Sequence, residues 1–259
     1  MRATEPGLLH RLRRDARSYA ANVLPARVVP FCIVTNGRSG SSLLVDLLDS
    51  QPRIWCDEEL FSVWRDMPRL YVRGRLHGAR YRGYQAYGFK LNTLGLAEQF
   101  LSTSPKGGPV RLLRHLAADG FAFIHLRRRN LLRQAISALR AEEGRFHYRT
   151  SDEIPTKRLE IDVPTVLGLM TRFEVHDAGL ATIYEAVPHA TFWYEDDLAD
   201  PERQHATVEA VCKLLGLPVH PSSTELRKVG GSPLEQEVAN FDELTASVRI
   251  TRFARFLDD

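Results

Sequence analysis

The sequence predicts an α/β fold of three layers, with a mostly parallel central sheet and helices on both faces. Two segments read as an apolar strand, a short turn and an amphipathic helix, over 28–48 and 120–143. Between and after them, further strands and helices alternate, which is the pattern of a parallel sheet. Ligands of such sheets bind at the carboxyl ends of the strands, where both turns lie. We therefore expect a single domain over 1–259 whose site is built by these two turns.

The composition excludes several classes of protein. A net charge of +3 in 259 residues does not indicate general nucleic-acid binding. The three cysteines form no CxxC motif, so we expect neither a disulfide framework nor a metal site, and a reducing, cytoplasmic location. No apolar run approaches the roughly 20 residues of a membrane span. Residues 1–27 lack the apolar core of a signal peptide and are interpreted as an N-terminal arm.

The first turn has the composition of an anion site. Residues 28–34 form the expected strand, and the glycines that follow allow the backbone to turn and to approach a ligand closely. A serine, Ser41 or Ser42, is expected to cap the next helix. The N–H groups at a helix start attract anions, and Arg38 adds a cation that can grip a phosphate or sulfate.

The stretch after the first helix carries candidate acids and a candidate cation. The stretch 50–61 is interpreted to begin as a loop at Gln51 and Pro52 and to end in two carboxylates, Glu58 and Glu59, just after Asp57. The Arg- and Tyr-rich segment 62–84 lacks clear periodicity and is expected to be irregular or to hold short helices. As an insertion over 62–86, it would be either a lid on the acceptor side or a plain surface insertion. A short strand over 87–91 contains Lys90.

The second unit has arginines in its turn. A buried strand over 120–126 runs into Arg127, Arg128 and Arg129, and then into a helix that stops near Gly144. The other expected elements are helices at 94–101, 110–118, 163–187 and 201–215, a strand at 191–194, loops at 145–162 and 225–235, and short helices at 240–248 and 250–257.

The amino-acid sequence of the first turn, TNGRSGSSLL, resembles the 5′-phosphosulfate loop of sulfotransferases. It is not a Walker A loop, because no lysine follows Gly40. The resemblance is closest to bacterial carbohydrate sulfotransferases, such as trehalose 2-sulfotransferase and the nodulation sulfotransferases. It implies a P-loop-like fold and 3′-phosphoadenosine 5′-phosphosulfate (PAPS) as co-substrate, with PAP, the adenosine bisphosphate, as product. The residues it assigns to the 5′-phosphate are Gly37, Arg38, Ser39, Gly40, Ser41 and Ser42.

Other segments resemble the same family over residues 31–257. Arg129 and Ser137 have the spacing of its 3′-phosphate site, and Arg227 with Lys228 resembles its late basic loop. The segments Glu59–Phe61 and Gly88–Lys90 resemble those that keep the catalytic glutamate and a lysine near the transferred group. The segment Trp193–Leu198 resembles the family's Tyr-Glu-Asp-Leu segment, whose role is structural more than catalytic.

The resemblance implies sulfonyl transfer to an acceptor hydroxyl without a metal ion. Glu59 would be the general base, with Glu58 and Asp57 as rivals, while Arg38 and Lys90 would stabilise charge. The acceptor is expected to be a small molecule or a glycan. We expect no nucleic-acid partner and no transmembrane segment, and the oligomeric state, including a homo-oligomer, is left open. Two alternatives stay: a P-loop nucleotide kinase, favoured by the acids after the strand at 191–194, and a non-catalytic nucleotide-binding module.

Overall fold

The structure of the protein is a computed structural model. It describes residues 28–62, 65, 67–95, 108–142, 148–149, 158–184, 187, 189–227 and 232–258. The expected N-terminal arm, most of the expected helix at 94–101, and Lys228 lie outside these residues.

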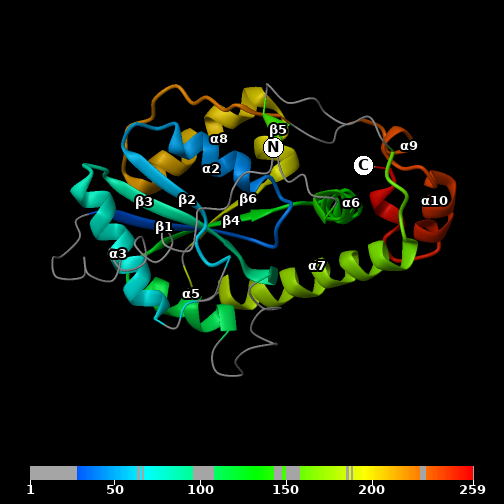
Figure 1. Cartoon of the computed structure of the whole chain (residues 1–259), viewed down its shortest axis with the longest axis horizontal. Coiled ribbons are helices and arrows are strands. Elements are labelled where there is room, and N and C mark those ends of the chain that lie inside the picture. Colours follow the sequence, from blue (N-terminus) through cyan, green and yellow to red (C-terminus); the bar gives the residue numbers. More distant parts are fainter. Residues whose placement is uncertain are drawn as a thin grey trace, which may run out of the picture.

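A five-stranded parallel sheet forms the centre, as the sequence predicts (Figure 1). The strand order is β2-β3-β1-β4-β6. The first strand of the chain, β1, therefore lies in the middle, between β3 and β4, and its carboxyl end points into the site region. The strands are β1 (Val29–Thr35), β2 (Ile54–Glu59), β3 (Ala86–Asn92), β4 (Ala122–Arg127) and β6 (His189–Trp193).

Helices cover both faces of the sheet, and side chains alternate along β1 to serve both. Phe31 and Ile33 pack in the apolar cluster of α2 (Ser41–Asp49) and α8 (Pro201–Leu215). Cys32 and Val34 pack in the cluster of α3 (Pro68–Tyr81), α5 (Gly108–Ala118) and α7 (Val163–Tyr184). Because successive residues of a strand point to opposite faces, one apolar run supplies two cores. The three-layer prediction is thus confirmed (Figure 1).

Most of the predicted elements are confirmed within a few residues. Both strand–turn–helix units form, with α6 (Leu131–Glu142) following β4. Helix α8 has the predicted bounds, Asp200 caps its start through the N–H of Glu202, and Gly216 ends it at φ 68°. The C-terminal segments are α10 (Phe241–Arg249) and a 3₁₀ turn, η3 (Ala254–Phe256).

The segment after α2 differs from the sequence analysis in two places. Residues 54–59, for which the sequence predicts no strand, form the edge strand β2, because pairing with β3 outweighs the weak local signal of three consecutive acids. Residues 68–81, expected to be irregular or in short helices, form the single helix α3. Its inner face carries Tyr71, Val72 and Ala79, all buried, so α3 belongs to the helical layer of the sheet.

Short elements near the C-terminus complete the described fold. Two residue pairs in segments that were expected to be loops form a small antiparallel ladder, β5 (Tyr148–Arg149) with β7 (Leu226–Arg227). A third apolar cluster joins α6, α7, α9 (Leu234–Glu237), α10 and η3. No helix in the described part of the chain is long and apolar enough to cross a membrane.

Candidate functional site

The first turn has a backbone that few sequences can adopt. Gly37, Arg38 and Gly40 have φ values of 86°, 54° and 80°, in the left-handed region. A Cβ atom at Gly40 would lie 2.5 Å from Cδ2 of Tyr194, in the π-helical turn η2 (Tyr194–Leu198). Positive φ at a non-glycine residue costs free energy and persists only when neighbours hold it. The turn is therefore a preorganised structure.

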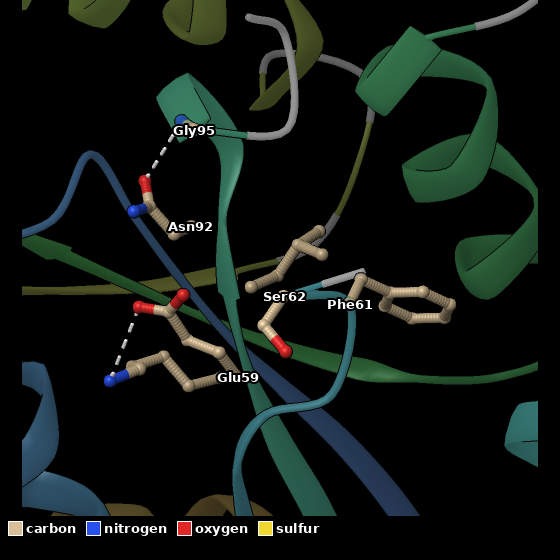
Figure 2. A pocket seen from close by; sticks show the side chains of 7 residues that line it. Glu59, Phe61, Ser62, Asn92 and Gly95 are labelled. Carbon is tan, nitrogen blue, oxygen red and sulfur yellow. Dashed lines mark hydrogen bonds and ion pairs between the residues drawn. The ribbon is translucent and has the colours of Figure 1, made fainter. Parts of the chain in front are cut away.

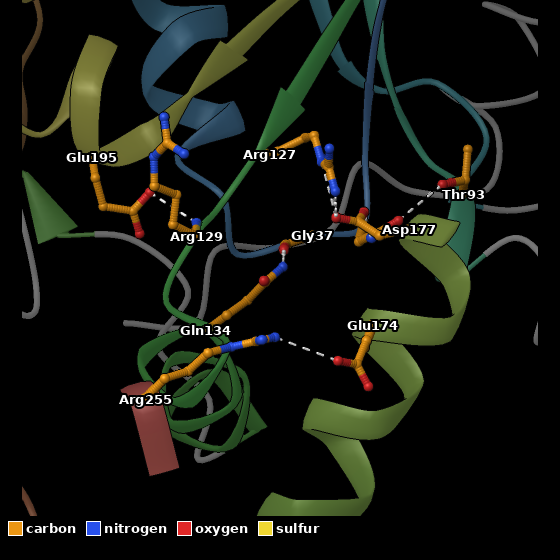
Figure 3. A network of polar contacts seen from close by, with 10 residues as sticks. Gly37, Thr93, Arg127, Arg129, Gln134, Glu174, Asp177, Glu195 and Arg255 are labelled. Atoms are coloured by element: carbon orange, nitrogen blue, oxygen red, sulfur yellow. Dashed lines mark hydrogen bonds and ion pairs between the residues drawn. The ribbon is translucent and has the colours of Figure 1, made fainter. Parts of the chain in front are cut away.

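Side chains from the second unit hold this turn. Gln134 Nε2 donates to the carbonyl of Gly37 at 2.7 Å, and Arg128 Nη1 donates to the carbonyl of Arg38 at 3.1 Å. Arg38 Nε in turn donates to Ser137 Oγ at 3.1 Å. The two units that the sequence singles out therefore meet at one place, with Arg38 and Ser137 in direct contact (Figure 3 shows Gln134 reaching Gly37).

The start of α2 is open toward this place. Its N-cap residue is Gly40, without a side-chain hydrogen bond, so the predicted serine cap is wrong. Instead, the Ser42 hydroxyl accepts a hydrogen bond from Lys90 Nζ at 3.0 Å. In the described residues no hydrogen bond uses the backbone N–H groups of 39–42. These donors and the positive end of the helix dipole are available to an anion.

The charges at the turn also favour an anion. Burial lowers the pKa of Arg38, the charge of Arg128 lowers it further, and Glu59 opposes this. Burial likewise lowers the pKa of Arg128. Arg128 Nε is buried without a hydrogen bond and lies 3.7 Å from Glu195 Oε1. Two partly desolvated cations repel each other, and an anion between them would remove that repulsion.

The second turn is neutralised by acids of η2. The Glu195 carboxylate accepts hydrogen bonds from the N–H groups of Arg129 and Asn130, at 2.9 and 3.2 Å. The Arg129 guanidinium pairs with Asp196, and half of its side chain is exposed (Figure 3 shows Glu195 beside Arg129). Of the three arginines, Arg128 and not Arg129 therefore contacts the first turn.

A lysine and two glutamates converge at the ends of β2 and β3. Asp57 pairs with Phe89 in the ladder and Glu59 pairs with Lys90, so Glu58 is an extra, bulged residue. This bulge brings both glutamates to the buried Lys90, whose Nζ pairs with Glu58 and lies 3.5 Å from Glu59 Oε1. The predicted neighbours Glu59 and Lys90 thus lie together, next to Ser42 of α2.

Asp57 is bound elsewhere. Its carboxylate accepts hydrogen bonds from Arg75 Nε at 2.9 Å and from the Tyr87 hydroxyl at 2.7 Å. The Arg75 guanidinium also stacks on the Trp55 ring at 4.2 Å. Asp57 therefore joins β2 to α3, and its lone pairs are used in the fold.

A pocket opens beside Glu59, with a volume of about 320 Å³ that includes open solvent. Its lining residues are Glu59, Phe61, Ser62, Lys90, Leu91, Asn92 and Gly95. Figure 2 shows the Phe61 ring directed away from the Glu59 carboxylate. Asn92 connects the pocket to the first turn, because a Cβ atom at Gly37 would lie 3.3 Å from Asn92 Nδ2.

A partly buried polar network lies below the first turn. Asp177 of α7 accepts from Asn36 Nδ2 through one oxygen and from Arg127 through the other, at 2.7 and 3.0 Å. Thr93 donates to the carbonyl of Thr35 at 3.1 Å. Asp177 therefore joins the residue after β1 to the last residue of β4 (Figure 3).

The late basic segment leads toward the start of α2. His220 N donates to Gln51 Oε1, past the end of α2, while Thr224 Oγ1 donates to Asp46 Oδ2 at 2.6 Å, farther toward its start. Ser232, beyond the undescribed residues 228–231, accepts from Arg133 Nη1 of α6 at 3.2 Å. The backbone of Arg227 belongs to β7, and Lys228 lies outside the described residues.

Replacing Gly40 with alanine is expected to lower both stability and anion affinity. The left-handed backbone and the 2.5 Å approach to Tyr194 together should cost about 1–3 kcal/mol of unfolding free energy. Gly216→Ala is the matched control, because Gly216 has φ +68° and nothing within 4 Å of a Cβ atom. Thermal unfolding and calorimetry with a phosphate ligand should show an affinity loss for Gly40→Ala alone. Equal affinities in the two variants would contradict a role of this close approach.

Asp177→Asn tests the network below the turn. The change leaves the Arg127 guanidinium without its carboxylate, and we expect a loss of about 1–3 kcal/mol of stability together with weaker binding of a phosphate ligand at the turn. The control is Asp119→Asn, which breaks the more exposed ion pair to Arg69 and should cost about 1 kcal/mol or less. Denaturant titration and calorimetry measure the two effects. Unchanged affinity for the phosphate ligand in Asp177→Asn would show that the network does not position the turn.

Several residues of this site escape sequence reasoning. Arg128 could not be told from its two neighbours, because the turn after β4 decides which guanidinium points inward. Asp177 lies in the middle of α7, where an isolated acid gives no signal. Tyr194 had a usable signal, because it opens the acidic segment after β6.

The sequence matches no protein-family model and no curated protein. The functional conclusion therefore depends on the residues and contacts described above.

Proposed function

We propose that this protein is a sulfotransferase that moves a sulfonyl group from PAPS to a hydroxyl group of an uncharged acceptor, such as a carbohydrate, glycolipid or glycosylated natural product. One observation carries the proposal. Four residues that sequence resemblance assigns to one reaction form two contacting pairs at the two sides of the first turn and the start of α2: Arg38 bonds to Ser137, and Lys90 contacts both Glu59 and Ser42 of α2.

The site fits a doubly anionic nucleotide by several features. The N–H groups at 39–42, which have no hydrogen bond within the described residues, and the partly buried cations Arg38 and Arg128 favour bound oxyanions. The N–H groups of the first turn would hold the 5′-phosphate, and Ser137 would contact the 3′-phosphate. Arg129 would join it by exchanging Asp196 for phosphate.

In the proposed reaction the protein positions its groups and stabilises charge. Glu59 accepts the proton of the acceptor hydroxyl, whose oxygen forms a bond to sulfur as the bond between sulfur and the 5′-phosphate oxygen breaks. Lys90 stabilises the sulfonyl oxygens, while Arg38 and the N–H groups at the start of α2 take up charge on the leaving phosphate. Positioned donors of this kind supply most of the catalysis in related phosphoryl transfer.

The charge of the pocket favours a neutral acceptor. Lys90 is the cation among the lining residues, and it already contacts both Glu58 and Glu59. An anionic acceptor would find this lysine already paired with carboxylates, whereas sugar hydroxyls can bond to carboxylate, amide and hydroxyl groups.

The direct test is turnover with labelled PAPS and a panel of neutral and anionic hydroxyl acceptors, with and without EDTA. We expect transfer to neutral acceptors that survives EDTA. Transfer from ATP that requires Mg²⁺ would support the kinase alternative, and PAP binding without any transfer would support the non-catalytic module. The kinase alternative has less support, because Glu195 and Asp196 contact backbone N–H groups and Arg129.

Arg129→Ala is expected to weaken PAP binding by about tenfold while binding of adenosine 5′-phosphate, which lacks the 3′-phosphate, changes little. The reason is that only the 3′-phosphate would compete with Asp196 for this arginine. Arg128→Ala, at the first turn, should weaken both ligands. Calorimetry measures all four affinities, and equal losses for the two ligands in Arg129→Ala would contradict the assignment.

A further inference from the structure

One helical layer of the protein carries a strongly basic outer surface. Within residues 67–95 and 108–120 the one acid is Asp119, which pairs with Arg69. Helices α3 and α5 contact each other on the same face of the sheet (Figure 1). Six arginines at or beside their ends and along the helices are exposed. This basic face consists of Arg69, Arg73, Arg80, Arg82, Arg111 and Arg114.

The opposite layer has no such excess. Helix α2 contains Asp46 and Asp49, and α8 contains acids and bases in equal number. Because the whole chain has a net charge of only +3, positive charge is concentrated on the α3–α5 side. The pKa of His77, between two of these arginines, is lowered by burial first and then by the charges of Arg73 and Arg80.

Large apolar side chains lie among these arginines. Met67, Leu70 and Tyr81, at or within α3, are 53%, 38% and 94% exposed. On a helical projection they occupy the sector beside Arg69, Arg73 and Arg80, because residues three, four and eleven apart share one side of a helix. The exposed apolar side chains therefore lie beside the arginines at the two ends of α3, while Gly74 and His77, between Leu70 and Tyr81 on the same side, are buried.

We propose that the basic face binds an anionic lipid surface. Phospholipid headgroups supply a layer of negative charge for the arginines, and the headgroup–acyl boundary accepts exposed apolar and aromatic side chains. Nucleic acid or an acidic protein would satisfy the arginines equally well. The exposed Met67, Leu70 and Tyr81 favour lipid, because they gain from leaving water in the acyl boundary. This binding does not depend on the proposed reaction.

The test is co-sedimentation of the full-length protein with vesicles of neutral phosphatidylcholine, or with about a third of phosphatidylglycerol added. We expect binding to the anionic vesicles only, reduced at about 0.5 M salt because the charges are exposed. The double variant Arg80→Glu/Tyr81→Ser should bind at least about tenfold more weakly. One arginine near such a surface contributes about fivefold, and this change also reverses the charge.

The matched control is Arg249→Glu/Ile250→Ser, the same change of charge and polarity at the far end of the molecule (Figure 1, α10). Ile250 is 88% exposed, so the control removes a similar apolar surface and should retain vesicle binding. Thermal unfolding checks that each variant is folded. If the double variant does not fold, the single variant Arg73→Glu is used in its place.

Three results would overturn the proposal. The first is equal binding of the protein to neutral and anionic vesicles, or to neither. The second is an equal loss in the control variant. The third is binding of an oligonucleotide, with the same sensitivity to Arg80→Glu/Tyr81→Ser, in the absence of vesicle binding.

Discussion

Glu59→Gln is expected to lower kcat by about 10²–10⁴, the usual cost of losing a general base. Glutamine keeps the shape of the side chain at the pocket wall but cannot accept the proton of the acceptor hydroxyl. The affinity for PAP should change little, because the contacts of the first turn come from other residues. Steady-state kinetics with a neutral acceptor and calorimetry with PAP measure the two quantities.

The matched control is Glu58→Gln, one residue earlier in β2. Glu58 pairs with Lys90 and accepts from Ser42 Oγ at 3.3 Å, but it does not line the pocket. Its replacement should disturb the lysine and reduce kcat by a smaller factor. Near full turnover in Glu59→Gln, together with a large loss in Glu58→Gln, would reverse the assignment of the base.

Arg38→Ala should weaken PAP binding by about 10²-fold, because each hydrogen bond to a charged group contributes about 1.5–3 kcal/mol. Arg38 is partly buried at the first turn and bonds to Ser137, so its loss removes charge and also an ordered contact between the two units. Calorimetry with PAP gives the affinity, and thermal unfolding reports any change in stability.

Two further variants separate the reasons for such a loss. Arg38→Lys keeps the charge but not the planar fork, so it should recover only part of the affinity. Arg69→Ala removes an exposed arginine paired with Asp119 and should leave PAP binding unchanged. Wild-type affinity in Arg38→Ala would mean that the first turn does not bind the nucleotide.

The fold could be predicted where the signal is local. The apolar runs of β1 and β4, each followed by an amphipathic helix, indicated both units, and Gly216 indicated the end of α8. Strand β2 and helix α3 could not be predicted in this way. Strand β2 contains three consecutive acids, and its two buried residues, Ile54 and Cys56, gain their packing only beside β3.

The candidate site divides along the same line. The sequence by itself determined the residue types: a turn that contains glycines and an arginine, an arginine cluster after a strand, and candidate acids with a candidate lysine. Only the tertiary structure decided which members meet. In the structure Arg128 contacts the first turn and Arg129 pairs with Asp196. A bulge at Glu58 brings two glutamates to Lys90.

The physical reason is the range of the interactions. Backbone preference and hydrophobic periodicity act over a few residues, so they can be read along the chain. Ion pairs, ladder register and side-chain contacts join residues that are far apart in sequence, such as Asn36 with Asp177 and Arg38 with Ser137. Their outcome depends on the packing of the whole sheet and its helices.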